Sequence, residues 1–555
     1  MHSRQPGPLC HVALHARANH VSRPLLQPVS PPARRRGARF SLRPALCLRH
    51  SPSLYHRHRA CHRELDRPAP DPSKDRGLAA MSRRRVLDPV EAGALLLMAA
   101  FLLLCLRVSP GRAAPAGAEV TEFPGFHGVL PSKHYAGYIT VGHEQQNRHL
   151  YYYLATSERN PTLDPVVIWI NGGPACSGFS AFHHSIGPFK IEYSQVHVKD
   201  DPRATKNPYS WTKMASLLLV DSPAGVGYSY AENDDDYITN DTSRVADLYD
   251  FLSKWFAEYT EFMSNPFYVA GCSYSGVIVP VLAQEILKRN EEPYRMKINF
   301  KGYSLCNPAV DVDIENNAHV PYAFRVGLIS EELFQSLVTT CTGRYWNNSN
   351  PSCQENMEQF YMQIKGINME HILCPPCRYK MGITKEFMEY DYGQMFKRIS
   401  KSSSHGLECH DQEQALEKLF DTNLGRAKLH AKEPEVSGRW KRCPKHIQYT
   451  RDILTLTEYH LNVTSKGYRV FLYSGDHSLL VPFSATMEWL KKLNYKETEK
   501  WHPWFVENQI AGYSIRYGSN ILFATIKGAG HVPSDYLPFE AFVAYQRWID
   551  GAASL

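Results

Sequence analysis

The chain has 555 residues, of which 43% are hydrophobic and 21% are charged, a composition typical of globular proteins. Its net charge of +7 is unevenly distributed, because residues 1–80 carry +11, residues 81–118 carry +3 and residues 119–555 carry −7. A mildly acidic main part argues against a basic nucleic-acid-binding surface, so no nucleic-acid partner is expected.

Residues 81–118 have the features of a secretory signal peptide. A basic start at Met81 is followed by fifteen uncharged, mostly apolar residues, 92–106, and then by small residues that end at Ala118. This apolar stretch is short for a membrane span, so a single membrane anchor is the less favoured alternative. Residues 1–80, which are rich in Arg, Pro and Ser, are interpreted as a disordered basic extension or a gene-model artefact. The mature protein is expected to start near Glu119, to be extracellular or vacuolar, and to lack a stable membrane span.

Cysteine usage after residue 118 agrees with this compartment. Nine cysteines follow, and five of them lie between Cys341 and Cys409, which indicates a disulfide-stapled segment. Three Asn-X-Ser/Thr sequons predict glycosylation at Asn240, Asn347 and Asn462.

Eight apolar or aromatic runs predict strands. Several are continuous rather than alternating, as expected for strands buried on both faces of a largely parallel sheet. In chain order they are 135–141, 149–156, 165–171, 215–221, 266–271, 298–305, 468–475 and 521–528.

Helical patterns lie between some of these runs and predict an α/β fold. The clearest helix covers 241–262, where Asp241 or Thr242 is a plausible N-cap. Between about 310 and 435 the strand pattern stops, and helical patches and cysteines replace it. We interpret this region as an insertion, or lid, over the end of the sheet where α/β proteins bind ligands. Loops 171–182 and 221–230 directly follow strands and should lie at the same end.

Ser273 has the local sequence of a nucleophile. It lies in "VAGCSYSG", between a predicted buried strand and a predicted helix, and Gly271 and Ser275 supply the small residues that a sharp turn requires. A buried serine beside a tight turn is the structural alternative.

His531 and Asp476 are the candidate partners of Ser273. Hydrolases with this turn carry their catalytic residues in the order serine, acid, histidine. His531 follows the last predicted strand in "KGAGH", where a loop-borne general base is expected. Asp476 is the only carboxylate in "VFLYSGDHSLLVP" after the preceding strand.

Five ordered motifs resemble the serine carboxypeptidase family of α/β-hydrolases. They are "WINGGPACS", "DSPAGVGYSY", "GCSYSG", "YSGDHS" and "KGAGH", and the match covers essentially all of 119–555. Further segments, such as "GVIVPVLAQEI" and "NQIAGYSIRY", resemble the plant carboxypeptidase-like branch, which includes acyltransferases that use sugar-ester donors.

The resemblance implies an α/β-hydrolase fold and a role for each matching residue. Ser273 would be the nucleophile and His531 the base, while the N–H groups of Gly173 and Tyr274 would form the oxyanion hole. It also implies the disulfides Cys176–Cys443, Cys341–Cys353 and Cys377–Cys409, which would leave Cys272, Cys306 and Cys374 unpaired.

Two departures from the family pattern concern the substrate's terminal carboxylate. Family peptidases hold it with an asparagine, matched by Asn171, and with two acids that share a proton. Cys272 and Ser185 stand at the acid positions, and Cys272 is expected to be a free thiol. Each lost charge-assisted hydrogen bond is worth about 1.5–3 kcal/mol, which weighs against an ordinary exopeptidase.

The third departure concerns the triad acid. In the family's "G-D-x-D" turn the second aspartate is that acid, and Ser478 stands there in this chain. Loss of triad-acid function costs about 10⁴ in turnover in a serine protease, so Asp476 would have to substitute from two residues away.

The favoured function is therefore a sugar-ester-dependent acyltransferase or weak hydrolase. A serine carboxypeptidase and a catalytically silent ligand- or partner-binding protein remain as alternatives. The partners would be a small acyl donor and acceptor or a peptide C-terminus, with a homodimer left open. No cofactor or metal is implied by the sequence.

Overall fold

The computed structural model describes residues 114–142, 147–192, 202–375, 408–518 and 520–555, with side chains described from residue 414 onward in the fourth range. Residues 1–80 and residues 81–113 of the predicted leader (81–118) lie outside the described residues. No helix among the residues described is long and apolar enough to cross a membrane.

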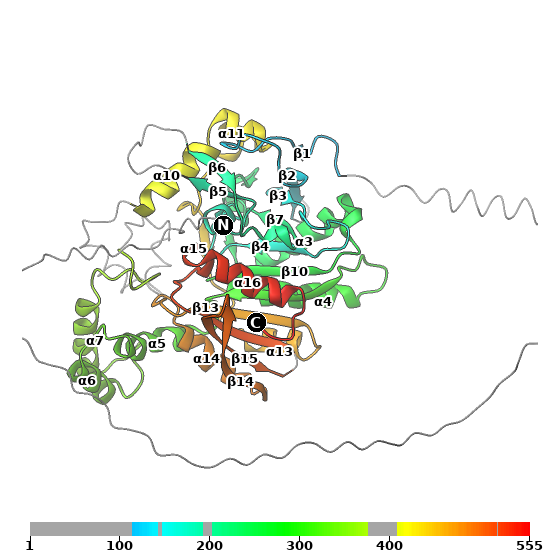
Figure 1. Cartoon of the computed structure of the whole chain (residues 1–555). Coiled ribbons are helices and arrows are strands. Elements are labelled where there is room, and N and C mark those ends of the chain that lie inside the picture. Colours follow the sequence, from blue (N-terminus) through cyan, green and yellow to red (C-terminus); the bar gives the residue numbers. More distant parts are fainter. Residues whose placement is uncertain (1–113, 143–146, 193–201, 376–407, 519) are drawn as a thin grey trace, which may run out of the picture. The chain divides into compact units, whose positions relative to one another are not determined.

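A twelve-stranded mixed sheet forms the centre of the fold (Figure 1). Its six middle strands are parallel, and the strands at both sides of them are antiparallel. The spatial order is β1 (Glu119–Val120), β2 (His134–Val141), β3 (Arg148–Ala155), β7 (Ser216–Val220), β4 (Val166–Ile170), β10 (Phe267–Cys272), β11 (Phe300–Cys306), β13 (Arg469–Gly475), β16 (Ile521–Ile526), β15 (Gln509–Tyr517) and β14 (Glu497–Val506); β8 (Tyr230–Ala231) pairs with β3.

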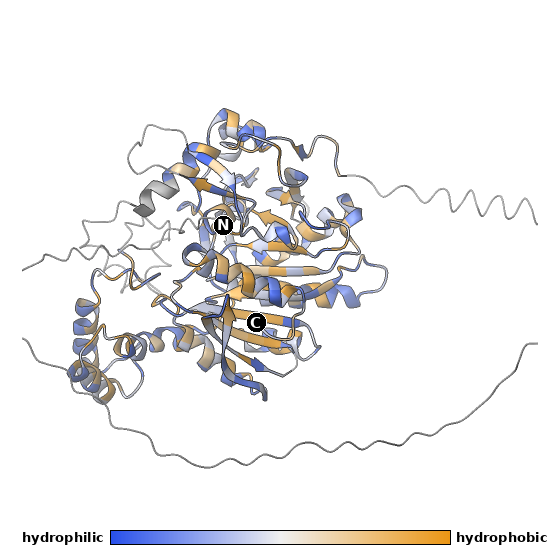
Figure 2. Cartoon of the chain, viewed as in Figure 1, coloured by the Kyte–Doolittle hydropathy of each residue, from blue (hydrophilic) through white to orange (hydrophobic). Residues whose placement is uncertain are grey.

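All eight predicted strands are present. The middle strands are buried on both faces, which explains their continuous apolar sequences, and Figure 2 shows them mostly in the hydrophobic colour. Two strand pairs outside the main sheet complete the β-structure: β5 (Phe189–Glu192) with β6 (Arg203–Lys206), and β9 (Ile238–Asn240) with β12 (Gln448–Thr450).

Helices cover both faces of the sheet through two separate apolar clusters. One cluster packs α3 (Asp241–Glu258), α4 (Ser275–Glu291), α13 (Thr457–Thr464) and α14 (Phe483–Lys492) against one face. The other packs α2 (Ser180–His183) and α16 (Pro538–Ile549) against the opposite face. The predicted helix at 241–262 is α3, and its N-cap is Asn240, whose side chain accepts a hydrogen bond from the Ser243 N–H.

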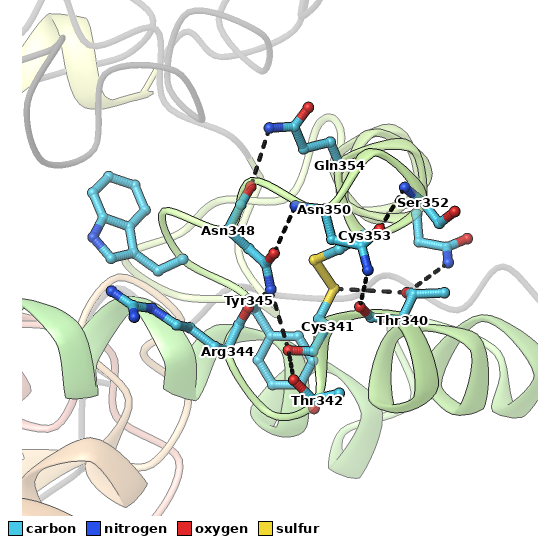
Figure 3. The surroundings of a disulfide bond; sticks show 12 residues. Thr340, Cys341, Thr342, Arg344, Tyr345, Asn348, Asn350, Ser352, Cys353 and Gln354 are labelled. Carbon is cyan, nitrogen blue, oxygen red and sulfur yellow. Dashed lines mark hydrogen bonds between the residues drawn. A yellow bond between two sulfur atoms is a disulfide. The ribbon is translucent and has the colours of Figure 1, made fainter.

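The region predicted as an insertion is helical where it is described. It contains α5 (Val312–Arg325), α6 (Glu331–Cys341), α7 (Pro351–Gln363), α10 (Glu408–Phe420), α11 (Asn423–Lys428) and α12 (Pro434–Ser437). The Cys341–Cys353 disulfide joins the end of α6 to the start of α7, and Asn348 and Asn350 hydrogen-bond the backbone between them (Figure 3).

Part of the insertion contacts two turns that follow sheet strands. The carbonyl of Glu370 accepts a hydrogen bond from the His531 N–H at 2.7 Å. The carbonyl of Met369 accepts from the N–H groups of Leu479 and Leu480 at 2.9 and 2.8 Å. Residues 369–370 therefore bridge the turn after β13 and the turn after β16, which brings the insertion to the carboxyl end of the parallel strands.

Candidate active site

Ser273 occupies a sharp turn between β10 and α4. Its backbone has φ 61°, a left-handed conformation that costs a residue other than glycine on the order of 1–3 kcal/mol. The Ser273 N–H donates to the Cys306 carbonyl at 2.9 Å, and its own carbonyl accepts from the Ala309 N–H at 3.0 Å. Neighbouring backbone therefore holds the strained turn in place, as a nucleophile elbow requires.

The small residues beside Ser273 each have a steric reason. A Cβ added to Gly271 would lie 2.5 Å from Ser275 Cβ and 2.6 Å from the Ile170 carbonyl oxygen. Ser275 fits the crowded side of the turn, and its hydroxyl donates to that same Ile170 carbonyl at 2.6 Å. The second serine of "GCSYSG" thus helps to hold the elbow against the neighbouring strand.

His531 follows β16 and is buried, with 4% of its surface exposed. Its Nε2 has no hydrogen-bond partner among the residues that the structure describes, so the Ser273–His531 contact is open here. Such hydrogen bonds are often long in enzymes without substrate. Burial, and secondarily the nearby His184, lowers the pKa of His531 to about 3. His531 is therefore neutral and able to accept a proton, but its protonated form is poorly stabilised.

The position facing His531 Nδ1 is occupied by Ser478. The Ser478 hydroxyl lies 3.3 Å from Nδ1 and is fully buried. Asp476 makes other contacts: its Oδ1 is 2.7 Å from His477 Nδ1 and accepts the Gly528 N–H at 2.7 Å. Asp476 makes no hydrogen bond with His531 among the described residues, so its substitution for the triad acid stays a prediction.

The segment 171–173 packs directly against the elbow. A Cβ added to Gly172 would lie 2.9 Å from Tyr274 N and 3.0 Å from Ser273 Cβ, and Gly173 has φ 117°. A hydrogen bond fixes the side chain of Tyr274, because its hydroxyl donates to the Asp241 carboxylate at 2.7 Å. This arrangement brings the two expected oxyanion-hole residues, Gly173 and Tyr274, next to Ser273.

Asp221 holds the loop that follows this segment. Its carboxylate accepts the Ser177 hydroxyl at 2.5 Å and the N–H groups of Gly178 and Tyr228 at 2.9 Å each. Burial raises the pKa of Asp221 to about 6, although its three donors act in the opposite direction. Asp221 opens the motif "DSPAGVGYSY", but its supporting role could not be predicted from sequence, because that role depends on contacts with Ser177 and Gly178, more than 40 positions away.

Cys272 is not a free thiol. It forms a disulfide with Cys306, the last residue of the neighbouring strand β11. The two cysteines are directly paired in the parallel register of β10 and β11, with Cα atoms 4.5 Å apart. This finding corrects the expectation that Cys272 and Cys306 are both unpaired. A disulfide therefore stands at position 272, where family peptidases have one of their two carboxylate-binding acids.

The other two expected carboxylate-binding residues are Asn171 and Ser185. Asn171 is buried directly after β4, and Ser185 has φ 55°, with its carbonyl accepting from Asn207 Nδ2 at 2.7 Å. The structure thus contains Asn171 without either partner acid at the matching positions.

Two of the three implied disulfides, Cys176–Cys443 and Cys341–Cys353, are present. Cys374 is disulfide-bonded as well, which corrects the expectation that it is unpaired. The implied Cys377–Cys409 pair lies outside the residues whose side chains are described.

A group of buried and half-buried ionisable residues that could not be found from the sequence lies beside His531. The ring of His184 is 3.1 Å from Asp535, and His183, Glu370 and Arg442 lie within electrostatic reach of Asp535. Burial lowers the pKa of His183 and of His184 to about 3 and raises the pKa of Glu370 and of Asp535 to about 7. The adjacent histidines of "HHS" are the one local signal that pointed here.

Comparisons with known proteins agree with this architecture. Residues 124–551 match the family model described as serine carboxypeptidase. Serine carboxypeptidase 1 of Hordeum vulgare is 41% identical over 472 residues, covering 79% of this chain and 94% of that protein. Serine carboxypeptidase-like 20 of Arabidopsis thaliana is 38% identical over 472 residues, with the same two coverages.

A solved structure shows the same fold. Kex1(Δ)p, a prohormone-processing carboxypeptidase from Saccharomyces cerevisiae, superimposes with a TM-score of 0.59 at 17% identity, covering 79% of this chain and 96% of that one. The mostly parallel middle of the sheet, the disulfides and this likeness together establish an α/β-hydrolase fold. With the family model matched over most of the chain, this protein belongs to the serine carboxypeptidase family.

Proposed function

We propose that the protein forms a covalent acyl-enzyme at Ser273, with His531 as the general base. The observation that carries this proposal is the strained backbone of Ser273, held at φ 61° between β10 and α4. The Ser273 hydroxyl would attack the substrate carbonyl, and His531 would accept its proton and return it to the leaving group. The adjacent N–H groups of Gly173 and Tyr274 would stabilise the oxyanion.

Peptide C-termini are the substrate class that the comparisons support. The Hordeum relative is named a serine carboxypeptidase, and the solved structure with the same fold is a carboxypeptidase. No relative reported above is named an acyltransferase, so the comparisons favour release of a C-terminal residue, whereas the residues of the site favour the second candidate.

Acyl transfer from an ester donor is the second candidate, and the residues beside the elbow favour it. A peptide C-terminus carries a carboxylate that family peptidases bind with two acids sharing a proton. Cys272 is consumed in a disulfide and Ser185 bears no charge, so this means of capture is missing. An activated ester lacks that carboxylate and needs no such binding group.

We further propose a secretory location, extracellular or vacuolar. Disulfides persist in oxidising compartments, and this chain has bridges at Cys176–Cys443, Cys272–Cys306 and Cys341–Cys353. Of the predicted glycosylation sites, Asn347 and Asn462 are exposed, while Asn240 is half-buried.

Labelling with a fluorophosphonate probe should distinguish a working serine from a silent one. We expect the unmodified protein to be labelled, because Ser273 is presented on the elbow, and we expect Ser273→Ala to remain unlabelled. Ser465→Ala is the control, since it removes an exposed serine hydroxyl outside the elbow and should still be labelled. Equal labelling of parent and Ser273→Ala, or none of the parent, would favour a ligand-binding protein without catalytic activity.

Hydrolysis of blocked dipeptides should be weak or absent in the unmodified protein. The missing carboxylate-binding acids predict this result, whereas a small activated ester should still acylate Ser273. Cleavage would be followed by release of the C-terminal amino acid, with an ester assay run on the same sample. Robust release of C-terminal residues would refute the ester preference and support the peptidase.

A further inference from the structure

A cluster of three metal-ligating side chains joins α2 to α15 (Pro533–Tyr536). It consists of His183, the last residue of α2, His184, which follows it, and Asp535 on α15. One ligand atom from each residue lies within 4.8 Å of the other two. His184 Nδ1 and an Asp535 oxygen are 3.1 Å apart, and their side chains are 7% and 20% exposed.

The chemistry of this cluster matches a transition-metal site. Two imidazoles and one carboxylate form a ligand set that suits Zn²⁺, with a fourth coordination position left for water. Metal–ligand bonds of about 2.0–2.2 Å place tetrahedral ligand atoms roughly 3.3 Å apart. The His184–Asp535 separation of 3.1 Å already meets this requirement, and a His183 ring nitrogen within 4.8 Å of both would have to move closer when the ion binds. The partial exposure of Asp535 gives an ion an entry path.

A simple hydrogen-bonded His184–Asp535 pair explains less of the arrangement. Such a pair needs no third group, yet the His183 ring is turned to the same place. Among the residues that the structure describes, the His183 ring makes no hydrogen bond to another group. The centroids of the His183 and His184 rings are 5.3 Å apart.

The charges around the cluster are compatible with a cation. Arg442 lies within electrostatic reach of both histidines and of Asp535, and alone would disfavour a metal ion. The buried carboxyl of Glu370 lies close to Arg442 and Asp535. The two carboxyl groups outnumber the one guanidinium around the cluster.

We propose that His183, His184 and Asp535 bind one divalent transition-metal ion, for which Zn²⁺ is the best match. The ion would tie the helix that follows the oxyanion loop to the short helix that begins two residues after His531. The ligands do not include Ser273 or His531, although His184 lies within electrostatic reach of His531, and metal binding does not depend on the catalytic activity proposed above.

The test is a direct titration of the full secreted protein after treatment with a chelator. We expect one equivalent of Zn²⁺ to bind and to raise the melting temperature, because the ion binds only the folded state. Co²⁺ should give the visible absorption of a tetrahedral N/O site. His183→Asn should weaken Zn²⁺ binding by about tenfold or more and remove the thermal shift.

His371→Asn is the matched control, because His371 packs against Tyr536 of α15 but is not part of the cluster. It should bind Zn²⁺ like the parent. Asp535→Asn removes the carboxylate ligand and should also weaken Zn²⁺ binding; if this variant does not fold, His183→Asn still decides the outcome. Absence of Zn²⁺ binding, or equal binding by the parent and His183→Asn, would overturn the proposal. Probe labelling of Ser273 is read separately, so neither result determines the other.

Discussion

Ser478→Asp is expected to raise the turnover of a small activated ester by roughly tens-fold or more. This is a small part of the factor of about 10⁴ that is lost when the triad acid of a serine protease is removed. The Ser478 hydroxyl is 3.3 Å from His531 Nδ1, so an aspartate at this position would place a carboxylate beside the imidazole. An adjacent negative charge stabilises imidazolium, and the pKa of His531 should rise from its present value of about 3. The measurement is kcat on the ester as a function of pH, where the acidic limb should move to higher pH.

Asp476→Asn is the control for this substitution. Its carboxylate is engaged by His477 and the Gly528 N–H, so the change should have little effect in the parent or in the Ser478→Asp background. An inert Ser478→Asp together with an inactive Asp476→Asn would make Asp476 the third member of the triad. If neither substitution alters turnover and Ser273 is not labelled, the fold has been retained without its chemistry.

Asp221→Ala is expected to lower the free energy of unfolding by about 3–5 kcal/mol. The substitution leaves three buried donors, from Ser177, Gly178 and Tyr228, without their acceptor, and each unsatisfied donor costs about 1–3 kcal/mol. Denaturant unfolding followed by tryptophan fluorescence would measure the loss. Probe labelling should fall as well, because the released loop directly follows the oxyanion segment.

Two further substitutions calibrate this result. Asp221→Asn keeps the side-chain shape and one acceptor oxygen, so its loss should be smaller than that of Asp221→Ala. Glu291→Ala removes an exposed ion-pair partner of Lys466 and should change the free energy of unfolding by less than about 1 kcal/mol. A change for Asp221→Ala no larger than that of Glu291→Ala would show that the carboxylate does not support the loop.

Much of the fold follows from local sequence patterns. Continuous apolar runs such as 166–170 predict strands because both faces of the middle strands are buried. The strand β14 was missed, because it is largely exposed and charged and contains Pro503, so neither alternation nor an apolar run marks it. The antiparallel flanks of the sheet also depend on pairing between strands, which a local pattern does not encode.

The candidate site divides in the same way. Ser273 and His531 could be found from sequence because each follows a strand in a compact motif. The Cys272–Cys306 bridge could not, since it depends on the register between two strands 34 residues apart. The His184–Asp535 contact joins residues 351 positions apart, and the direction of Asp476 is decided by Gly528 across the turn.

Because the Cys272–Cys306 disulfide adjoins the nucleophile Ser273, neither cysteine can be replaced without affecting the other. Replacing Cys272 by the acid that family peptidases have at this position would leave Cys306 as an unpaired, buried thiol. It would also bury a carboxylate beside that thiol. A route back to carboxylate recognition therefore requires both cysteines to change together, along with Ser185. Protein expressed in a reducing cytoplasm would lack the Cys272–Cys306 disulfide. Measurements on Ser273 therefore need protein that was folded under oxidising conditions.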